Sequence, residues 1–208
     1  MKVLMINGSP HKDGCTYTGL CEVASQLNAR GIETEIFHIG SGATHGCIDC
    51  GACIKTGYCV FNEDKLNQCV DLLKAADGLV VGSPVYYAGP NGALCAFLDR
   101  LFYHKSQHYA QKPAAAIVNC RRGGASAAFD RLNKYFTISN MPVVSSQYWN
   151  ATHGFTPEQM RQDEEGMQIL RTLGRNMAFL LESIAAGHAR GLDPQPDEPR
   201  VATHFIRG

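Results

Sequence analysis

The sequence alternates short strand-like runs with segments of helical periodicity. The first run, KVLMIN at residues 2–7, is almost continuously apolar, which is typical of a strand buried on both faces of a parallel sheet. Apolar residues recur at helical spacing between the runs. The alternation predicts an α/β fold with an open parallel five-stranded sheet, helices on both faces and right-handed crossovers. The strands are expected at residues 2–7, 32–39, 77–87, 114–119 and 141–147.

The length of 208 residues suits one domain with a single core. We expect this domain over residues 1–187, with a cysteine-rich insertion at 40–62 and an irregular tail at 188–208. Thr156, Pro157 and Gln159 have the spacing of a helix start, so one long final helix is predicted from this point.

The charge balance excludes a strong electrostatic preference for nucleic acids or membranes. Lysines and arginines number 19, and so do aspartates and glutamates. The sequence shows no apolar run of about 18 residues, and the N-terminal stretch is too short for a secretory signal. We therefore expect a cytoplasmic protein with a small-molecule or protein partner and no nucleic-acid or membrane partner.

Three of the expected strands end in loops of unusual composition, at the sheet edge where α/β proteins bind ligands. The first loop, GSPHKDGCTYT at residues 8–18, places small and hydroxyl-bearing residues before a helix. Backbone N–H groups and the helix dipole at such a place favour a phosphate. The loop matches neither the dinucleotide fingerprint nor the P-loop, so an ATPase is not expected.

The other two loops suit a flat ligand. The second loop, GSPVYYAGPNG at residues 82–92, brings apolar and aromatic side chains to a backbone rich in glycine and proline. The third loop, NCRRGGA at residues 119–125, offers two arginines to an anionic group or a ring carbonyl. Together the three loops predict a site for a mononucleotide with a planar ring.

With these motifs the chain resembles the flavodoxin-like FMN-dependent oxidoreductases, in particular the NAD(P)H-dependent FMN reductases and the iron–sulfur flavoproteins. The resemblance rests on GSPHKDGCT, CIDCGACIKTGYCVFNED and GSPVYYAGPNGALCAFLDR, and it covers residues 1–155. It implies sheet order 2-1-3-4-5, FMN as cofactor, NAD(P)H as co-substrate and a homodimer or homotetramer. The cofactor-binding residues expected from the loops and the resemblance are Ser9, His11, Gly14, Cys15, Thr16, Pro84, Val85, Tyr86, Tyr87, Gly89, Asn119, Arg121, Arg122 and Gly124.

Four of the nine cysteines cluster in the stretch CIDCGACIKTGYC. Their three-residue steps let one short loop direct several thiolates toward an iron–sulfur core, and no second set is present for another cluster. A [4Fe–4S] cluster is therefore the first hypothesis. Structural zinc, a redox-active disulfide and unliganded thiols stay open as alternatives. The expected metal ligands are Cys47, Cys50, Cys53 and Cys59.

These features predict an FMN-dependent oxidoreductase. It would pass electrons from NAD(P)H or a reduced ferredoxin to a small acceptor such as a quinone, a nitro or azo compound, a flavin or oxygen, with the cluster as a one-electron entry. The flavin carries the chemistry, so no catalytic side-chain set is expected. A non-enzymatic flavodoxin-type electron carrier and a thiol or zinc redox sensor are the alternatives.

Overall fold

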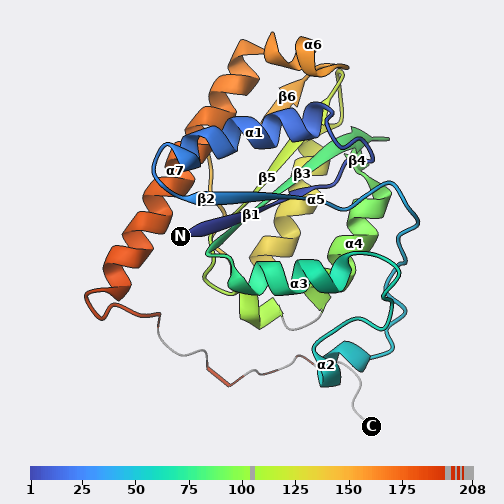
Figure 1. Ribbon diagram of the computed structural model, residues 1–208, viewed down its shortest axis with the longest axis vertical. Helices are drawn as coiled ribbons and strands as arrows, with labels where there is room; N and C mark the ends of the chain where they lie inside the picture. Colours follow the sequence, from blue (N-terminus) through green and yellow to red (C-terminus); the bar gives the residue numbers. More distant parts are fainter. Residues whose placement is uncertain (104–105, 195–197, 200, 202, 204–208) are drawn as a thin grey trace.

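The chain folds around a mainly parallel sheet (Figure 1). The computed structural model describes all residues except 104–105, 195–197, 200, 202 and 204–208. The parallel strands lie in the order β2-β1-β3-β5-β6, and a two-residue strand, β4, pairs antiparallel with β3. Counted over the parallel strands alone, this is the predicted order 2-1-3-4-5, which is thereby confirmed. The strands are β1 (Lys2–Asn7), β2 (Glu33–His38), β3 (Gly78–Tyr86), β4 (Gly89–Pro90), β5 (Ala114–Cys120) and β6 (Ala151–His153).

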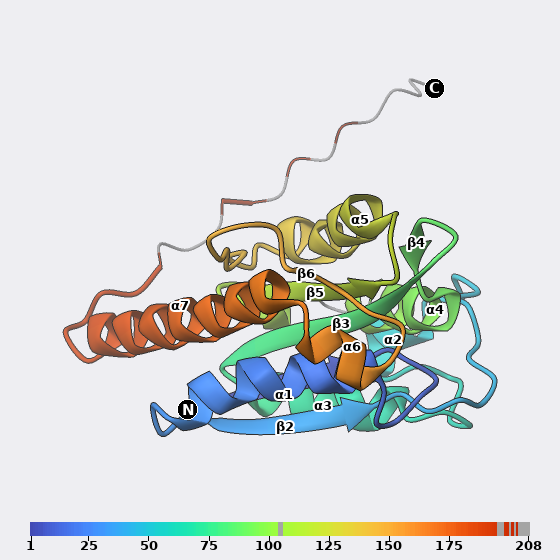
Figure 2. The same ribbon diagram turned by 90° about the horizontal axis from the view of Figure 1, so that it is seen from above.

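Helices cover both faces of the sheet (Figures 1 and 2). One layer consists of α1 (Cys15–Asn28), α6 (Pro157–Arg161) and α7 (Glu164–His188), and the other of α3 (Leu66–Ala75), α4 (Gly92–Tyr103) and α5 (Ala125–Ile138). Alternate strand residues point to opposite faces of the sheet and contribute to a core on each face. Val3 and Met5 pack toward α1 and α7, whereas Leu4 and Ile6 pack toward α3 and α4. The sheet is thus buried on both faces, as its continuous apolar strands require. A short α2 (Ala52–Thr56) and a 3₁₀ turn at Ser106–Tyr109 complete the helices.

The fifth parallel strand does not lie where the sequence predicted it. Within residues 141–147 only Val143 makes a bridge, to Ala114, and regular pairing with β5 resumes at Ala151–His153. Between Val143 and β6, a side chain takes the place of the backbone hydrogen bonds of a strand: Asn150 Nδ2 donates to the carbonyl of Ala116 at 3.1 Å. Polar side chains thus satisfy this edge of the sheet, which a pattern of β-branched residues could not reveal.

The predicted single final helix is two helices. Thr156 caps α6, because its Oγ1 accepts from the N–H of Gln159 at 3.3 Å. The chain then turns, and Asp163 caps α7 by accepting from the N–H of Gly166 at 2.9 Å. The start signal was therefore correct, but a second cap seven residues later starts a new helix.

The limits set for the domain, the insertion and the tail remain predictions. Residues 40–62 contain α2 and lead along the side of the domain that carries α4 (Figure 1), and α7 ends at His188. Of the helices in the described part of the chain, none has the length and apolar character needed to cross a bilayer.

Candidate functional site

A cleft of about 810 Å³ opens beside the carboxyl ends of β1, β3 and β5. This volume lies in the range of small-molecule and cofactor sites. Residues at or just beyond the carboxyl ends of four different parallel strands line the cleft, as expected at such a sheet edge. The cleft therefore joins the three loops that the sequence singled out and adds a fourth segment.

The first loop is held from beneath by a buried asparagine. Asn7 accepts from the N–H of Ser9 at 3.1 Å and donates to the carbonyl of Lys12 at 3.0 Å. The Nε2 of His38 lies 2.8 Å from the carbonyl oxygen of Ser9. Gly14 is the N-cap of α1, and its helix start receives no side-chain cap from the described residues. The first N–H groups of α1 are therefore available to a ligand in the cleft.

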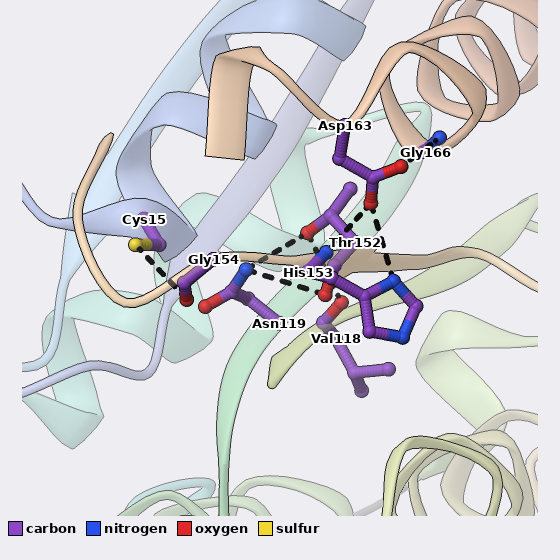
Figure 3. Close-up of polar contacts among 8 residues, drawn as sticks. All are labelled: Cys15, Val118, Asn119, Thr152, His153, Gly154, Asp163 and Gly166. Carbon is purple, nitrogen blue, oxygen red and sulfur yellow. Dashed lines mark hydrogen bonds and ion pairs between the residues drawn. The ribbon is translucent and has the colours of Figure 1, made fainter. Parts of the chain in front are cut away.

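Two buried hydroxyl residues and a thiol accompany these amides. Ser9 and Thr16 are almost fully buried, and Ser9 Oγ accepts from the N–H of His11 at 3.1 Å. Cys15 points its sulfur toward the carbonyl of Gly154 at 3.9 Å (Figure 3). Burial raises the pKa of the Cys15 thiol, so this side chain is neutral at physiological pH. These three side chains thus add no negative charge to the cleft, which the first loop also lines with Lys12 and Asp13.

The second loop is a β-hairpin formed by β3 and β4. Val85 pairs with Pro90 and Tyr86 with Gly89. The two residues at the tip, Tyr87 and Ala88, have φ values of 49° and 60°. Positive φ at both positions is the mark of a type I′ turn, which normally favours Asn-Gly, so the tip is held in a strained conformation by its surroundings.

Hydrogen bonds tie the first and second loops together. The N–H of Gly8 donates to the carbonyl of Gly82 at 2.9 Å. Asn91 donates from Nδ2 to the carbonyl of Gly8 at 2.7 Å, and its backbone N–H donates to Ser83 Oγ at 3.0 Å. The two walls of the cleft are therefore fixed relative to each other before any ligand binds.

The third loop reaches the cleft through Asn119 and Arg121. Figure 3 shows the Asn119 amide donating to Thr152, at 3.3 Å to the carbonyl and 3.1 Å to Oγ1, which fixes β5 against β6. Gly124 has a φ of +87°, and a Cβ at this position would lie 2.7 Å from the Cα of Ala88. The third loop therefore packs directly on the tip of the hairpin.

Most of the residues expected to bind the cofactor meet in the cleft. Four lie outside its lining: Tyr87 is fully exposed, Gly89 belongs to β4, and Arg122 and Gly124 line a neighbouring pocket of about 300 Å³. Those that line the cleft are Ser9, His11, Gly14, Cys15, Thr16, Pro84, Val85, Tyr86, Asn119 and Arg121.

Sequence reasoning missed the fourth segment of the lining, Gly154 to Pro157. It follows β6 directly, so placing the fifth strand ten residues too early concealed it. The signal was the Gly-Phe-Thr-Pro turn itself, which stands between a strand and a capped helix like the three recognised loops. Other residues of the first and third loops also line the cleft but were not among those expected to bind the cofactor: Pro10, Lys12, Asp13 and Cys120.

The four clustered thiols line a second, smaller pocket. Cys47, Cys50, Cys53 and Cys59 share it with Arg100 and Tyr103 of α4, among other residues. Burial raises the pKa of the Cys53 thiol, and the three neighbouring cysteines raise it further.

The backbone of this segment curves through residues in the left-handed conformation. Asp49, Gly51 and Gly57 have φ values of 51°, 66° and 89°. The N–H of Asp49 donates to Cys47 Sγ at 3.4 Å, and Arg100 Nη1 donates to Cys59 Sγ at 3.5 Å. Among the described residues, no three cysteine, histidine or acidic side chains are arranged to hold a single metal ion. The four thiols thus line one pocket, and two of their sulfurs accept hydrogen bonds, without forming the ligand set of a single metal ion.

The sheet order and the position of the cleft define a flavodoxin-like α/β protein. A flavodoxin from the domain Archaea superposes with a TM-score of 0.58 at 16% identity, covering 88% of this chain and 99% of that one. The flavoenzyme FerB of Paracoccus denitrificans, an NAD(P)H:(acceptor) oxidoreductase, superposes with a TM-score of 0.62 at 18% identity, covering 88% of this chain and 97% of that one. At these identities the likeness establishes the fold.

The sequence comparisons then establish the family. The family described as NADPH-dependent FMN reductase matches residues 1–156, and the chain belongs to it. An iron-sulfur flavoprotein of Methanocaldococcus jannaschii is 29% identical over 192 residues, which is 88% of this chain and 99% of the relative. An iron-sulfur flavoprotein of Methanosarcina thermophila is 29% identical over 188 residues, which is 88% and 97% of the two chains. The protein is thus a flavin-dependent oxidoreductase, and the resemblance seen in its motifs is confirmed.

Proposed function

We propose that the cleft binds FMN and that the protein passes electrons from NAD(P)H or a reduced ferredoxin to a small acceptor. One observation carries the proposal. The cleft has an uncapped helix start at the first loop and an apolar hairpin face at the second, so it offers donors for a phosphate and a surface for a planar ring.

The phosphate end would use residues of the first loop. Backbone N–H groups at the start of α1 supply donors and the positive end of the helix dipole. The hydroxyls of Ser9 and Thr16 lie at the same end and add donors without adding charge. Each charge-assisted hydrogen bond of this kind contributes about 1.5–3 kcal/mol.

The ring end would use the hairpin and the third loop. Pro84, Val85 and Tyr86 line the cleft and present apolar and aromatic surface to a flat ligand. Arg121 lies at the same cleft and would place a positive charge at the edge of the ring. Asn119 hydrogen-bonds to Thr152 of β6 and so fixes the end of β5 at the cleft. These contacts orient the ring and exclude water from it.

The thiol pocket suits a [4Fe–4S] cluster held by Cys47, Cys50, Cys53 and Cys59. Four thiols reach one pocket, and donors already point at two of the sulfurs. The relatives at 29% identity that carry the name iron-sulfur flavoprotein support this assignment.

FMN held by these residues would supply hydride and single-electron transfer, and the proposed acceptor is a quinone, a nitro or azo compound, a flavin or oxygen. A cluster would let a one-electron donor such as ferredoxin supply the same flavin. The protein would act as a homodimer or homotetramer in the cytoplasm. The chain's own residues bind and orient the cofactors, and none is required to act as a nucleophile.

FMN binding tests the site directly. Thr16→Val removes a donor from the phosphate end, so we expect FMN to bind about tenfold more weakly or worse, as measured by quenching of flavin fluorescence. Thr137→Val changes an exposed threonine of α5 and is the matched control. Equal affinities in both variants, or no uptake of FMN by the wild-type protein, would contradict the proposed site.

Turnover separates the proposed enzyme from an electron carrier or a sensor. Protein purified without oxygen should contain both flavin and iron, and it should oxidise NAD(P)H in the presence of menadione or a nitroarene without a protein partner. Reduction of the bound flavin without turnover would favour a flavodoxin-type carrier. Protein that contains zinc in place of iron and takes up no flavin would favour a sensor.

A further inference from the structure

Arg100 is buried beside the thiol pocket. Its side chain is 2% exposed, and that of its ion-pair partner, Asp64, is 8% exposed. Removing two charges from water costs several kcal/mol per ion in general, and a pair repays this only if further hydrogen bonds satisfy the remaining donors. The location of the pair therefore calls for another interaction of the guanidinium.

The hydrogen bonds of Arg100 point that interaction toward the thiols. Nη2 donates to Asp64, and Nη1 donates to Cys59 Sγ at 3.5 Å. Nε is buried and finds no hydrogen-bond partner within the described part of the chain. Arg100 also lines the pocket that the four thiols line. A buried donor without a partner is costly. The guanidinium therefore has one further hydrogen-bond donor, Nε, beside the thiol pocket.

We propose that Arg100 sets the reduction potential of the cluster and that Asp64 positions Arg100 and partly neutralises its charge. This inference rests on the proposed cluster. Reduction takes one electron from an external donor, oxidises that donor and makes the cluster one unit more negative. A positive charge and an N–H···S bond at a ligand sulfur favour the more negative form. Arg100 therefore makes the cluster easier to reduce.

The two partners of the ion pair should act in opposite directions. Arg100→Gln removes the charge and weakens the donor, so the potential falls. Asp64→Asn leaves the arginine charge without its counter-ion, so the potential rises. Loss of a merely structural ion pair would disturb the pocket in the same way from either side. Arg100→Lys keeps the charge but not the forked donor geometry and should restore part of the potential.

The experiment uses full-length protein with FMN and iron reconstituted without oxygen. The cluster potential is titrated with dithionite and followed by electron paramagnetic resonance, and iron content is measured in each sample. We expect Arg100→Gln to shift the one-electron reduction equilibrium at least tenfold against reduction, or 59 mV, and Asp64→Asn to shift it the other way. Arg131→Gln, which breaks the exposed Arg131–Asp99 pair, is the control and should leave the potential unchanged.

Each outcome decides the inference. The inference is overturned, with the proposed cluster intact, if Arg100→Gln and Asp64→Asn shift the potential in the same direction. It is also overturned if both variants, at full iron content, have a reduction equilibrium constant within threefold of the wild type. Wild-type protein that binds FMN but no iron would overturn the cluster and this inference together. If Arg100→Gln does not fold, Asp64→Asn still decides it, because an unchanged potential in that variant would contradict the role of the charge.

Discussion

Replacing Gly124 with alanine should force the third loop away from the tip of the β3–β4 hairpin. The new Cβ would lie 2.7 Å from the Cα of Ala88, whereas ordinary contacts begin at 3.4 Å, so one segment must move by about 0.7 Å. The backbone φ of +87° adds a second cost, because a side chain disfavours the left-handed conformation by about 1–2 kcal/mol. Overpacking typically costs about 1–3 kcal/mol. The expected loss in the free energy of unfolding is therefore about 2–5 kcal/mol.

Urea unfolding of Gly124→Ala measures this loss, and the midpoint should fall by about 1 M or more. FMN affinity should fall about tenfold, because Val85 lies 3.1 Å from the same Cβ and carries part of the ring wall. Gly123→Ala is the matched control, since a Cβ there meets nothing within 4 Å and its φ lies outside the left-handed range. If the two variants unfold at the same urea concentration, the packing of the loop on the hairpin is refuted.

Three further predictions concern the scaffold. Gly174→Ala should destabilise the protein by about 1–3 kcal/mol, because the new Cβ would lie 2.7 Å from a side chain of α1. Gly187→Ala, in the same helix, meets nothing closer than 3.8 Å and should stabilise the protein by up to about 1 kcal/mol. Equal stability of the two variants in chemical denaturation would contradict this. Lys112→Met should cost about 2–3 kcal/mol in urea unfolding, because Nζ donates to three carbonyls at the end of α3, at 2.6 to 2.9 Å; an unchanged midpoint would show that this cap is dispensable. Burial raises the pKa of Tyr109, so the unfolded chain loses this proton first and stability should fall as the pH rises above about 10; Tyr109→Phe should make that fall shallower, and an identical pH profile would argue against it.

The sequence was sufficient for the order of the strands and for the central strands because its signals there are strong and local. Continuous apolar runs placed β1 and β3, and the loops after them marked the edge where the cleft lies. Buried parallel strands carry their signature in every residue, so neither neighbours nor long-range contacts were needed to recognise them. The crossover rule then limited the order of the strands to few arrangements.

The short fifth strand escaped because tertiary contacts decide it, whereas the helix break depends on a local second cap at Asp163. β6 has three residues, and side-chain bonds of Asn150 complete its edge, which no hydrophobic period records. The neighbourhood of Arg100 was hidden for a similar reason, since Asp64 and Cys59 meet it only when α4 packs beside the thiol segment. From sequence alone Arg100 is one more charge on an amphipathic helix.

The helix α4 links the two candidate cofactor sites within one chain. It begins at Gly92, directly after the hairpin loop, and reaches Arg100 about 12 Å farther along its axis. A continuous α-helix rises by about 1.5 Å per residue, so the number of residues in α4 fixes the distance between the hairpin side of the cleft and the thiol pocket. Inserting a single residue into α4 would turn Arg100 by about 100° away from its thiol, whereas the same insertion in an exposed loop would leave that alignment untouched.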